Sequence, residues 1–355
     1  MSRTLRVLVV DDSVVARRIV SEIVDDEEDL EVVGSAANGR IALAKLPRLN
    51  PDVVTLDIDM PELDGLETLS RIRAEFPSVK VVMLSNLTEK GASATVESLF
   101  RGASDYVTKA SRMASAVEAR AYLREQLVPK LRALAGVPRS VPAVSRPRPA
   151  PPRVAMPAAS RAPIEIVAIG ASTGGPNALQ AVLQAVPGDF PVPIVIVQHM
   201  PENFTHYLAG RLDGKCSIRV HEAAAGDQLA PGHAWLAPGN RHMELKRTGD
   251  GLEIATTSEA PVNSCRPSVD VLFRTVAACF GGATLAVVLT GMGQDGLRGA
   301  ELIRAAGGRI LVQDQATSVV WGMPGQVASA GLAEAVLPIG EVGLEIVRRV
   351  LESRA

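Results

Sequence analysis

Acidic, hydroxyl and basic side chains stand at the ends of four short apolar runs in the first 110 residues: Asp11, Asp12, Asp57, Ser85 and Lys109. If these runs are neighbouring parallel strands, the five side chains meet at one edge of the sheet. Three carboxylates that share a site repel one another, and a Mg²⁺ ion with oxygen ligands relieves that repulsion. A carboxylate neutralised in this way can attack a phosphoryl group, whose oxygens the lysine and the serine hydroxyl would bind. Each residue alone could be a helix cap or a solvated turn residue, but five in strand-end register favour a common site.

A second set of residues begins at Ser172, which lies in the glycine-rich segment Gly170–Pro176 after an apolar run. A serine on a strand-to-helix turn flanked by glycines is held away from the backbone and is open to a substrate. The same glycines could instead hold a phosphate at a helix N-terminus, as in dinucleotide sites. The segment lacks both the G-x-G-x-x-G spacing and the Lys-Ser/Thr pair of a P-loop, which disfavours nucleotide binding.

His199 follows the next apolar run, PIVIVQ, and Asp295 lies in TGMGQDG after the run LAVVLT. Both therefore fall at carboxyl ends of predicted strands, as Ser172 does, where parallel sheets carry their active sites. A histidine that takes the serine proton and an aspartate that orients the histidine form a hydrolytic triad, whatever their order in the chain. We interpret the remaining histidines as surface or capping residues: His206, His221, His233 and His242.

The elements that must position these residues alternate between strand and helix patterns. Residues 5–125 contain five β-rich runs and five helical patterns, which predicts a parallel, doubly wound, flavodoxin-like sheet. From residue 164 the alternation resumes over a longer stretch, predicting a larger, mostly parallel α/β hydrolytic domain. A β-hairpin insertion is expected around residues 233–257. We thus predict domains at 1–127 and 164–355.

The intervening residues 128–163 carry seven basic residues, no acidic residue and nine of the 24 prolines, which predicts a linker. The region after it is acidic and has no basic recognition helix, so no nucleic-acid partner is expected. No apolar run approaches the roughly 18 residues of a membrane span, and the N-terminal run is too short for a signal peptide. We therefore expect a cytoplasmic protein without membrane insertion. The three cysteines form no C-x-x-C pair and are interpreted as reduced thiols: Cys216, Cys265 and Cys279.

Residues 5–125 resemble a response-regulator receiver domain through VVDDS at 9–13, LDIDMPELDGLE at 56–67, VMLSNLTEKG at 82–91 and GASDYVTK at 102–109. The resemblance implies that Asp57 is the phospho-acceptor and that Asp11 and Asp12, with Asp57 and the Asp59 carbonyl, hold Mg²⁺. It also implies that Ser85, Tyr106 and Lys109 form the switch. Ala110 departs from the family pattern, which has proline after the lysine.

Residues 164–355 resemble the catalytic domain of the CheB family of chemotaxis protein-glutamate methylesterases. The matching segments are AIGASTGGP at 168–176, VQHMP at 197–201, APGNRHM at 237–243, RPSVD at 266–270, LTGMGQDG at 289–296 and QDQATSVVWGMP at 313–324. By that resemblance Ser172, His199 and Asp295 are catalytic, and the Met292 backbone amide contributes to an oxyanion hole. Departures from the family are Ser264-Cys265, Gly325-Gln326 and the long linker.

The resemblance implies a phosphorylation-activated serine hydrolase of chemotaxis adaptation. It would remove methyl esters from receptor glutamates, releasing methanol, and deamidate receptor glutamines. The implied partners are methyl-accepting chemotaxis receptors as substrate and the histidine kinase CheA as phosphodonor. Mg²⁺ would serve receiver phosphorylation, no cofactor would serve ester hydrolysis, and the protein would be a monomer. Two alternatives are a DNA-binding transcription regulator, which the acidic effector region disfavours, and a receptor-binding scaffold without catalysis, which the three catalytic residue types disfavour.

Overall fold

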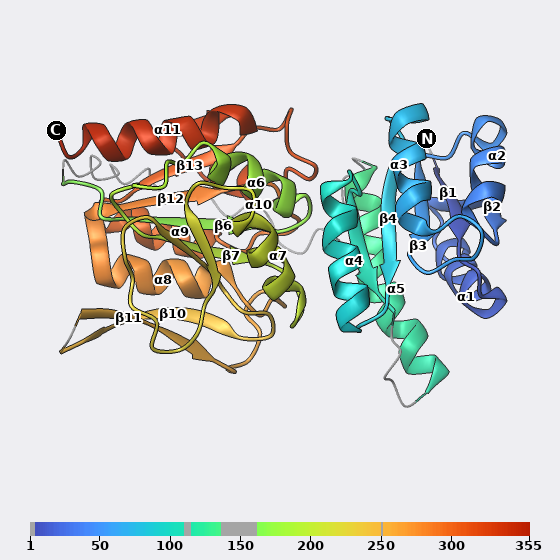
Figure 1. Cartoon of the computed structure of the whole chain (residues 1–355), viewed down its shortest axis with the longest axis horizontal. Helices are drawn as coiled ribbons and strands as arrows, with labels where there is room; N and C mark the ends of the chain where they lie inside the picture. The colour runs from blue at the N-terminus through green and yellow to red at the C-terminus, as the bar shows by residue number, and fades with distance from the viewer. Residues whose placement is uncertain (1–3, 110–114, 136–161, 250) are drawn as a thin grey trace, which may run out of the picture. The chain divides into compact units, whose positions relative to one another are not determined.

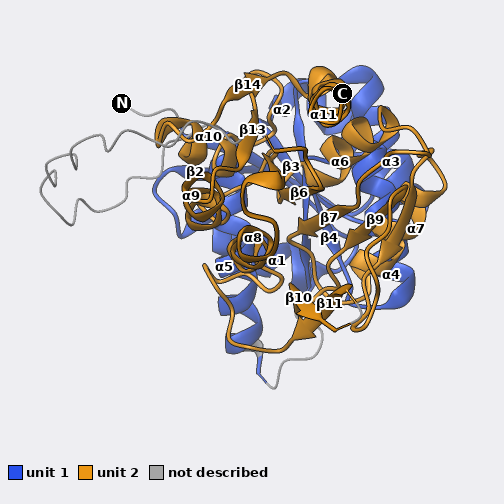
Figure 2. Cartoon of the chain, turned by 90° about the vertical axis from the view of Figure 1, so that its left-hand side faces the viewer, with its two compact units in different colours: residues 1–141 blue, residues 142–355 orange. Residues whose placement is uncertain are grey.

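The computed structural model describes residues 4–109, 115–135, 162–249 and 251–355. The chain divides into two compact units, Met1–Val141 and Pro142–Ala355 (Figure 2). The departure at Ala110 and most of the predicted linker, residues 136–161, lie outside the described residues. None of the helices in the described ranges has the length and apolar character needed to cross a bilayer.

The first unit is a parallel sheet of five strands in the order β2-β1-β3-β4-β5 (Figure 1). The strands are β1 Leu5–Val10, β2 Leu30–Ala36, β3 Val53–Asp57, β4 Lys80–Ser85 and β5 Asp105–Thr108. The helices are α1 Val14–Asp25, α2 Gly39–Leu49, α3 Gly65–Glu75, α4 Glu89–Phe100 and α5 Ala116–Leu134. The inner strand β3 is buried along its whole length, because helices cover both faces of the sheet. The predicted doubly wound architecture is confirmed.

Each helix of this unit begins at a residue whose side chain accepts a hydrogen bond from the first turn. These N-cap residues are Ser13, Asn38, Asp64, Thr88 and Ser115. Such caps typically stabilise a helix by about 1 kcal/mol each. The local sequence therefore fixes where every helix starts, and with it where each strand-to-helix loop presents its functional residue.

Helix α5 extends past the receiver boundary predicted at residue 127. Leu127, Val128, Leu131 and Leu134 are buried and recur at the spacing of one helix face. Residues 128–134, which the composition assigned to the linker, thus continue the helix, with Pro129 inside it. The high content of proline and basic residues concealed this apolar stripe.

The second unit contains a seven-stranded sheet in the order β14-β13-β12-β6-β7-β9-β8, in which every neighbouring pair is parallel. Its strands are β6 Ile166–Ala171, β7 Ile194–Gln198, β8 Arg219–Glu222, β9 His233–Leu236, β12 Thr284–Val288, β13 Arg309–Gln313 and β14 Ala335–Leu337. Its α-helices are α6 Gly175–Gln184, α7 Phe204–Asp213, α8 Val269–Phe280, α9 Leu297–Ala305, α10 Met323–Ser329 and α11 Ile339–Glu352. Helix α6 packs against α7 and α11, and helix α8 packs against α9. The prediction of a larger parallel α/β unit is confirmed.

The predicted hairpin insertion needs a correction of its boundary. It comprises β10 His242–Thr248 and β11 Gly251–Thr257, which pair antiparallel, and β10 packs on α8. His233–Leu236, the first part of the predicted range 233–257, instead forms β9 of the large sheet. The reason is burial. Between β7 and β8 the apolar side chains of this run are enclosed, whereas in an inserted hairpin they would be exposed.

Candidate functional site

The first unit brings its predicted acidic residues together at the carboxyl edge of the sheet. Asp11, Asp12 and Asp57 each place a carboxylate oxygen within 4.8 Å of the others. Lys109 follows β5, and its Nζ lies 2.7 Å from Asp11 Oδ2 and 2.8 Å from Asp57 Oδ1. Asp11 and Asp57 are buried, whereas Asp12 is exposed. One ammonium group therefore faces two buried carboxylates.

The electrostatics of this cluster leave negative charge uncompensated. Burial raises the pKa of Asp57 to about 6, and Asp11 adds to that rise, although Lys109 opposes it. Burial also lowers the pKa of Lys109, but Asp57 and Asp11 outweigh it and raise that pKa overall. Three carboxylates and one ammonium group leave a net negative charge, which a bound cation would compensate. The donor set consists of hard oxygen ligands, so it fits Mg²⁺.

Ser85 and Tyr106, the predicted switch residues, occupy defined positions in this structure. The Ser85 hydroxyl donates to the backbone oxygens of Asn86 and Gly91 and accepts from Thr95 Oγ1 at 2.5 Å. It is therefore engaged by the start of α4, and no hydrogen bond joins it to Asp57 in the described residues. The Tyr106 ring is buried, with Lys130 Nζ 5.0 Å from its centroid.

Ser172, His199 and Asp295 follow three adjacent strands of the second unit. Ser172 follows the central strand β6, His199 follows β7 on one side, and Asp295 lies beyond β12 on the other. The chain order reverses direction between β6 and β12, and such switch points are where open α/β sheets bind ligands. The topology therefore places all three predicted residues around one point of the carboxyl edge.

Asp295 is the most tightly held of the three. Its Oδ2 lies 2.8 Å from His199 Nε2 and also accepts from the backbone nitrogen of Val269. Its Oδ1 accepts from Asn263 Nδ2, Ser268 Oγ and the Asp270 nitrogen. Burial opposes ionisation of this carboxyl, but His199 and the other donors hold its pKa below the usual range. Asp295 is thus a fixed anion that orients the imidazole.

His199 is largely enclosed, with 13% of its side chain exposed. Burial disfavours its charged form, but hydrogen bonds with Asp295 and Cys265 outweigh burial and raise its pKa. Because Asp295 occupies Nε2, the ring nitrogen that remains for a proton donor is Nδ1, which faces Cys265 Sγ at 3.5 Å. Nδ1 is the atom that would accept a proton from a nucleophile.

Ser172 is held close to His199 by backbone and side-chain contacts. The His199 nitrogen donates to the oxygen of Ala171, the residue before Ser172. The buried Gln198 side chain donates to the carbonyls of both Ser172 and His199. The described residues contain no hydrogen bond between the Ser172 hydroxyl and His199. The Asp295–His199 part of the predicted triad is therefore formed, and the serine contact is not.

The loop that carries Gly291 and Met292 approaches Ser172. The Met292 amide has no hydrogen-bond partner within the described part of the chain. Gly174, the N-cap of α6, has φ +78°, and no side chain caps this helix. A Cβ on Gly291 would lie 2.7 Å from Ser172 Cβ, so glycine is needed for this loop to approach the serine. These features suit a developing oxyanion.

The sequence analysis assigned no role in the site to the residues of segment 263–268, which surround Asp295 and His199. Asn263 and Ser268 bind Asp295, and Cys265 Sγ lies 3.5 Å from His199 Nδ1. The spacing between His199 and Cys265 in the chain gave no signal, because the contact depends on a loop far along the sequence. His242, predicted as a surface or capping residue, is not at the surface, because it is buried and its Nε2 bonds to the Ala260 carbonyl.

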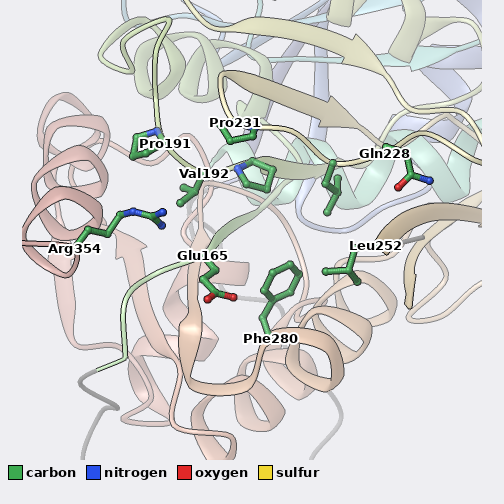
Figure 3. Close-up of a pocket in the computed structure, with 11 residues that line it drawn as sticks. Glu165, Pro191, Val192, Gln228, Pro231, Leu252, Phe280 and Arg354 are labelled. Carbon is green, nitrogen blue, oxygen red and sulfur yellow. The ribbon is translucent and has the colours of Figure 1, made fainter. Parts of the chain in front are cut away.

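A cavity of about 460 Å³ lies elsewhere on the second unit (Figure 3). Its lining includes Glu165 and Val192, which precede β6 and β7, together with Phe280 at the end of α8. These positions belong to the amino edge of the parallel sheet. The cavity is therefore at the opposite edge from Ser172, His199 and Asp295.

Comparisons with known proteins match both units. The sequence profile of the CheB methylesterase family matches residues 167–346, and that of the response regulator receiver domain matches residues 7–120. A protein-glutamate methylesterase/protein-glutamine glutaminase of Trichodesmium erythraeum is 51% identical over 350 residues, which are 97% of this chain and 99% of the relative. A protein of the same name from a Nocardioides species is 49% identical over 359 residues, with 99% and 96% covered. The crystal structure of the Thermotoga maritima CheB methylesterase catalytic domain matches with a TM-score of 0.51 and 39% identity, over 52% of this chain and 98% of that one.

Proposed function

The chain belongs to the CheB methylesterase family, and from this membership we propose that it is a protein-glutamate methylesterase and protein-glutamine glutaminase of bacterial chemotaxis. The reactions convert a receptor glutamate methyl ester and water to glutamate and methanol, and a receptor glutamine and water to glutamate and ammonia. The observation that carries the proposal is the Asp295–His199 hydrogen bond at the switch point of the sheet, next to Ser172.

In the proposed mechanism Ser172 Oγ attacks the carbonyl carbon while His199 Nδ1 takes its proton. Asp295 stabilises the imidazolium that forms, through the hydrogen bond at Nε2. The Met292 amide donates to the oxyanion of the tetrahedral intermediate. His199 then returns the proton to the leaving methanol or ammonia, and water attacks the acyl-enzyme in the same way.

The receiver unit supplies regulation by phosphorylation. We propose that Asp57 accepts a phosphoryl group from the kinase CheA, and that Asp11, Asp12, Asp57 and the Asp59 carbonyl would hold Mg²⁺. When bound, the ion would neutralise the carboxylates and the phosphoryl oxygens. Lys109 would bind a phosphoryl oxygen.

Ser85 would leave its present acceptors to donate to the phosphoryl group, and Tyr106 would stabilise the switched state by its packing. Phosphorylation of the receiver would raise the esterase activity. The proposal places the receiver domain from the N-terminus through helix α5, which ends at Leu134, and the catalytic domain at 164–355, with the linker between them. The protein would be a cytoplasmic monomer that acts on methyl-accepting receptors.

The test measures methanol release from methyl-labelled receptor membranes, with and without Mg²⁺ and a small-molecule phosphodonor. The wild type should release methanol, and faster with the phosphodonor. Ser172→Ala should release none above background yet still accept the phosphoryl group, because the receiver site is untouched. Normal release by Ser172→Ala would refute the assignment of the nucleophile.

A further inference from the structure

Cys265 lies on the reactive side of the catalytic histidine. Its Sγ is 3.5 Å from His199 Nδ1, while Asp295 Oδ2 is 2.8 Å from Nε2 of the same ring. The thiol of Cys265, the imidazole of His199 and the carboxylate of Asp295 are thus arranged as in cysteine hydrolases. In those enzymes the thiol contacts one ring nitrogen of the histidine and a hydrogen-bond acceptor binds the other. The mechanism proposed above has no role for this thiol.

The arrangement does not suit a metal ion, although a thiol, an imidazole and a carboxylate lie close together. Cys265 faces Nδ1 of the His199 ring and Asp295 faces Nε2. A cation can bind only one of these two nitrogens, so it would lie beside Cys265 or beside Asp295 but not between both side chains and the ring. Asp295 also accepts four hydrogen bonds besides that of His199, from Asn263, Ser268, Val269 and Asp270. A cation at this carboxylate would have to displace some of these donors. The geometry favours proton transfer over coordination.

We propose that Cys265 is an activated thiol and that its oxidation by a peroxide reversibly switches off the esterase. This inference rests on the proposed function, since it concerns regulation of the same site. Cys265 is half-buried, so a small oxidant such as hydrogen peroxide can reach it.

The chemistry balances with hydrogen peroxide as oxidant. His199 Nδ1 takes the thiol proton, and the thiolate sulfur attacks one peroxide oxygen. The O–O bond breaks, the sulfur becomes a sulfenic acid, and the hydroxide that leaves takes the proton from His199 to form water. Sulfur is oxidised by two electrons and peroxide is reduced to water and the sulfenic oxygen. An added thiol reduces the product back to cysteine through a mixed disulfide.

Oxidation would stop ester hydrolysis because both nucleophiles need the same nitrogen. Asp295 holds Nε2, which leaves Nδ1 as the only base for Ser172. An oxygen added to Cys265 extends the side chain toward Nδ1 and can hydrogen-bond to it. The sulfenic acid would thereby occupy the atom that must accept the serine proton.

The other two cysteines provide matched comparisons within the chain. Burial raises the pKa of Cys216 to about 11, and burial also raises the pKa of Cys279. Neither thiol contacts a histidine in the described ranges of the chain. Both should therefore remain protonated and react slowly with peroxide.

The experiment treats the reduced full-length protein with hydrogen peroxide and traps sulfenic acid with dimedone for mass spectrometry. Cys265 should be labelled about tenfold faster than Cys216 or Cys279. In His199→Gln the labelling of Cys265 should fall by a similar factor, because glutamine cannot take the proton. Equal labelling of the three cysteines, or unchanged labelling in His199→Gln, would overturn the activation of the thiol.

Esterase activity is measured in parallel, with each protein normalised to its own untreated activity. Peroxide should lower the activity of the wild type, Cys216→Ser and Cys279→Ser about tenfold or more, and dithiothreitol should restore it. Cys265→Ser should keep its activity through the same treatment, and an equal loss would overturn the regulatory role. Absence of esterase activity in the untreated wild type would instead refute the proposed function, which the dimedone labelling does not depend on.

Discussion

Replacing Asp57 with asparagine should stabilise the receiver unit at neutral pH. In the wild type, burial and the neighbouring Asp11 raise the pKa of Asp57 from 3.8 to about 6, even with Lys109 beside it. The folded state therefore holds this proton more tightly than the unfolded chain does. Ionising the carboxyl costs folding free energy, and an amide of nearly the same shape carries no such charge.

The magnitude follows from the size of the shift. Each pKa unit corresponds to about 1.4 kcal/mol, so the rise gives an upper limit of about 3 kcal/mol at pH 7. The contribution of this group to wild-type stability is greatest below pH 4, declines as the pH rises from about 4 to 6, and stays low above that. An amide does not reproduce every hydrogen bond of the carboxyl, which reduces the gain, so we expect Asp57→Asn to be about 1–2 kcal/mol more stable at pH 7.5. At pH 4 the two proteins should be close to equal.

The assay is urea unfolding of the full chain at both pH values. Hydrogen exchange of peptides from β1 and β3 monitors the unfolding of the first unit. Tryptophan fluorescence provides an internal control, because Trp235 and Trp321 both lie in the second unit and their transition should not move. A variant no more stable at pH 7.5 would refute the reasoning. An equal gain at both pH values would also refute it, because the effect would then not come from charge.

Three further outcomes are expected. Asp295→Asn should lower kcat for methanol release by about 10³–10⁴, because the amide cannot hold the His199 tautomer; a loss below tenfold in a folded protein would contradict this role. Gly291→Ala should lower kcat more than about tenfold while phosphorylation stays normal, because the added Cβ would lie 2.7 Å from Ser172 Cβ, and unchanged kcat would exclude this close approach. Phosphoryl transfer from a small phosphodonor to Asp57 should fall about tenfold per pH unit below pH 6 at low Mg²⁺, as the carboxylate takes up a proton; a flat profile down to pH 4.5 would contradict its raised pKa.

The sequence was sufficient for the architecture of both units because strand and helix patterns alternate without interruption. It was less reliable at the boundaries of domains and hairpins, where composition and apolar spacing predict different structures. Residues 128–134 have the composition of a linker but the apolar spacing of helix α5. The run at His233–Leu236 could begin a hairpin or complete a sheet, and only the space between β7 and β8 decides between them.

The site was predictable where a residue ends a strand. Ser172 and His199 directly follow β6 and β7, and Asp295 lies in the loop after the neighbouring strand β12, so the sheet edge brings them together. Cys265 and Asn263 were not predictable in this way, because they lie in a loop before α8 whose path is set by tertiary contacts with Asp295 and His199. No local pattern encodes where such a loop folds back.

Both units place an aspartate at the carboxyl edge of a parallel sheet, but the surroundings of the two carboxylates differ in charge and in hydrogen-bond donors. At the carboxyl edge of the first sheet, Asp57 has one ammonium neighbour and a raised pKa, so the proposed attack of its carboxylate on a phosphoryl group would need a cation to neutralise the site. At the edge of the second, Asp295 has five hydrogen-bond donors, which hold it as a permanent anion that performs no bond chemistry. The difference lies in the segments that surround each carboxylate, because the loop before α8 and the start of α8 supply four of the five donors to Asp295. Which aspartate reacts and which only orients a neighbour is thus decided by donor number, and adding a donor beside Asp57 should make it a poorer nucleophile.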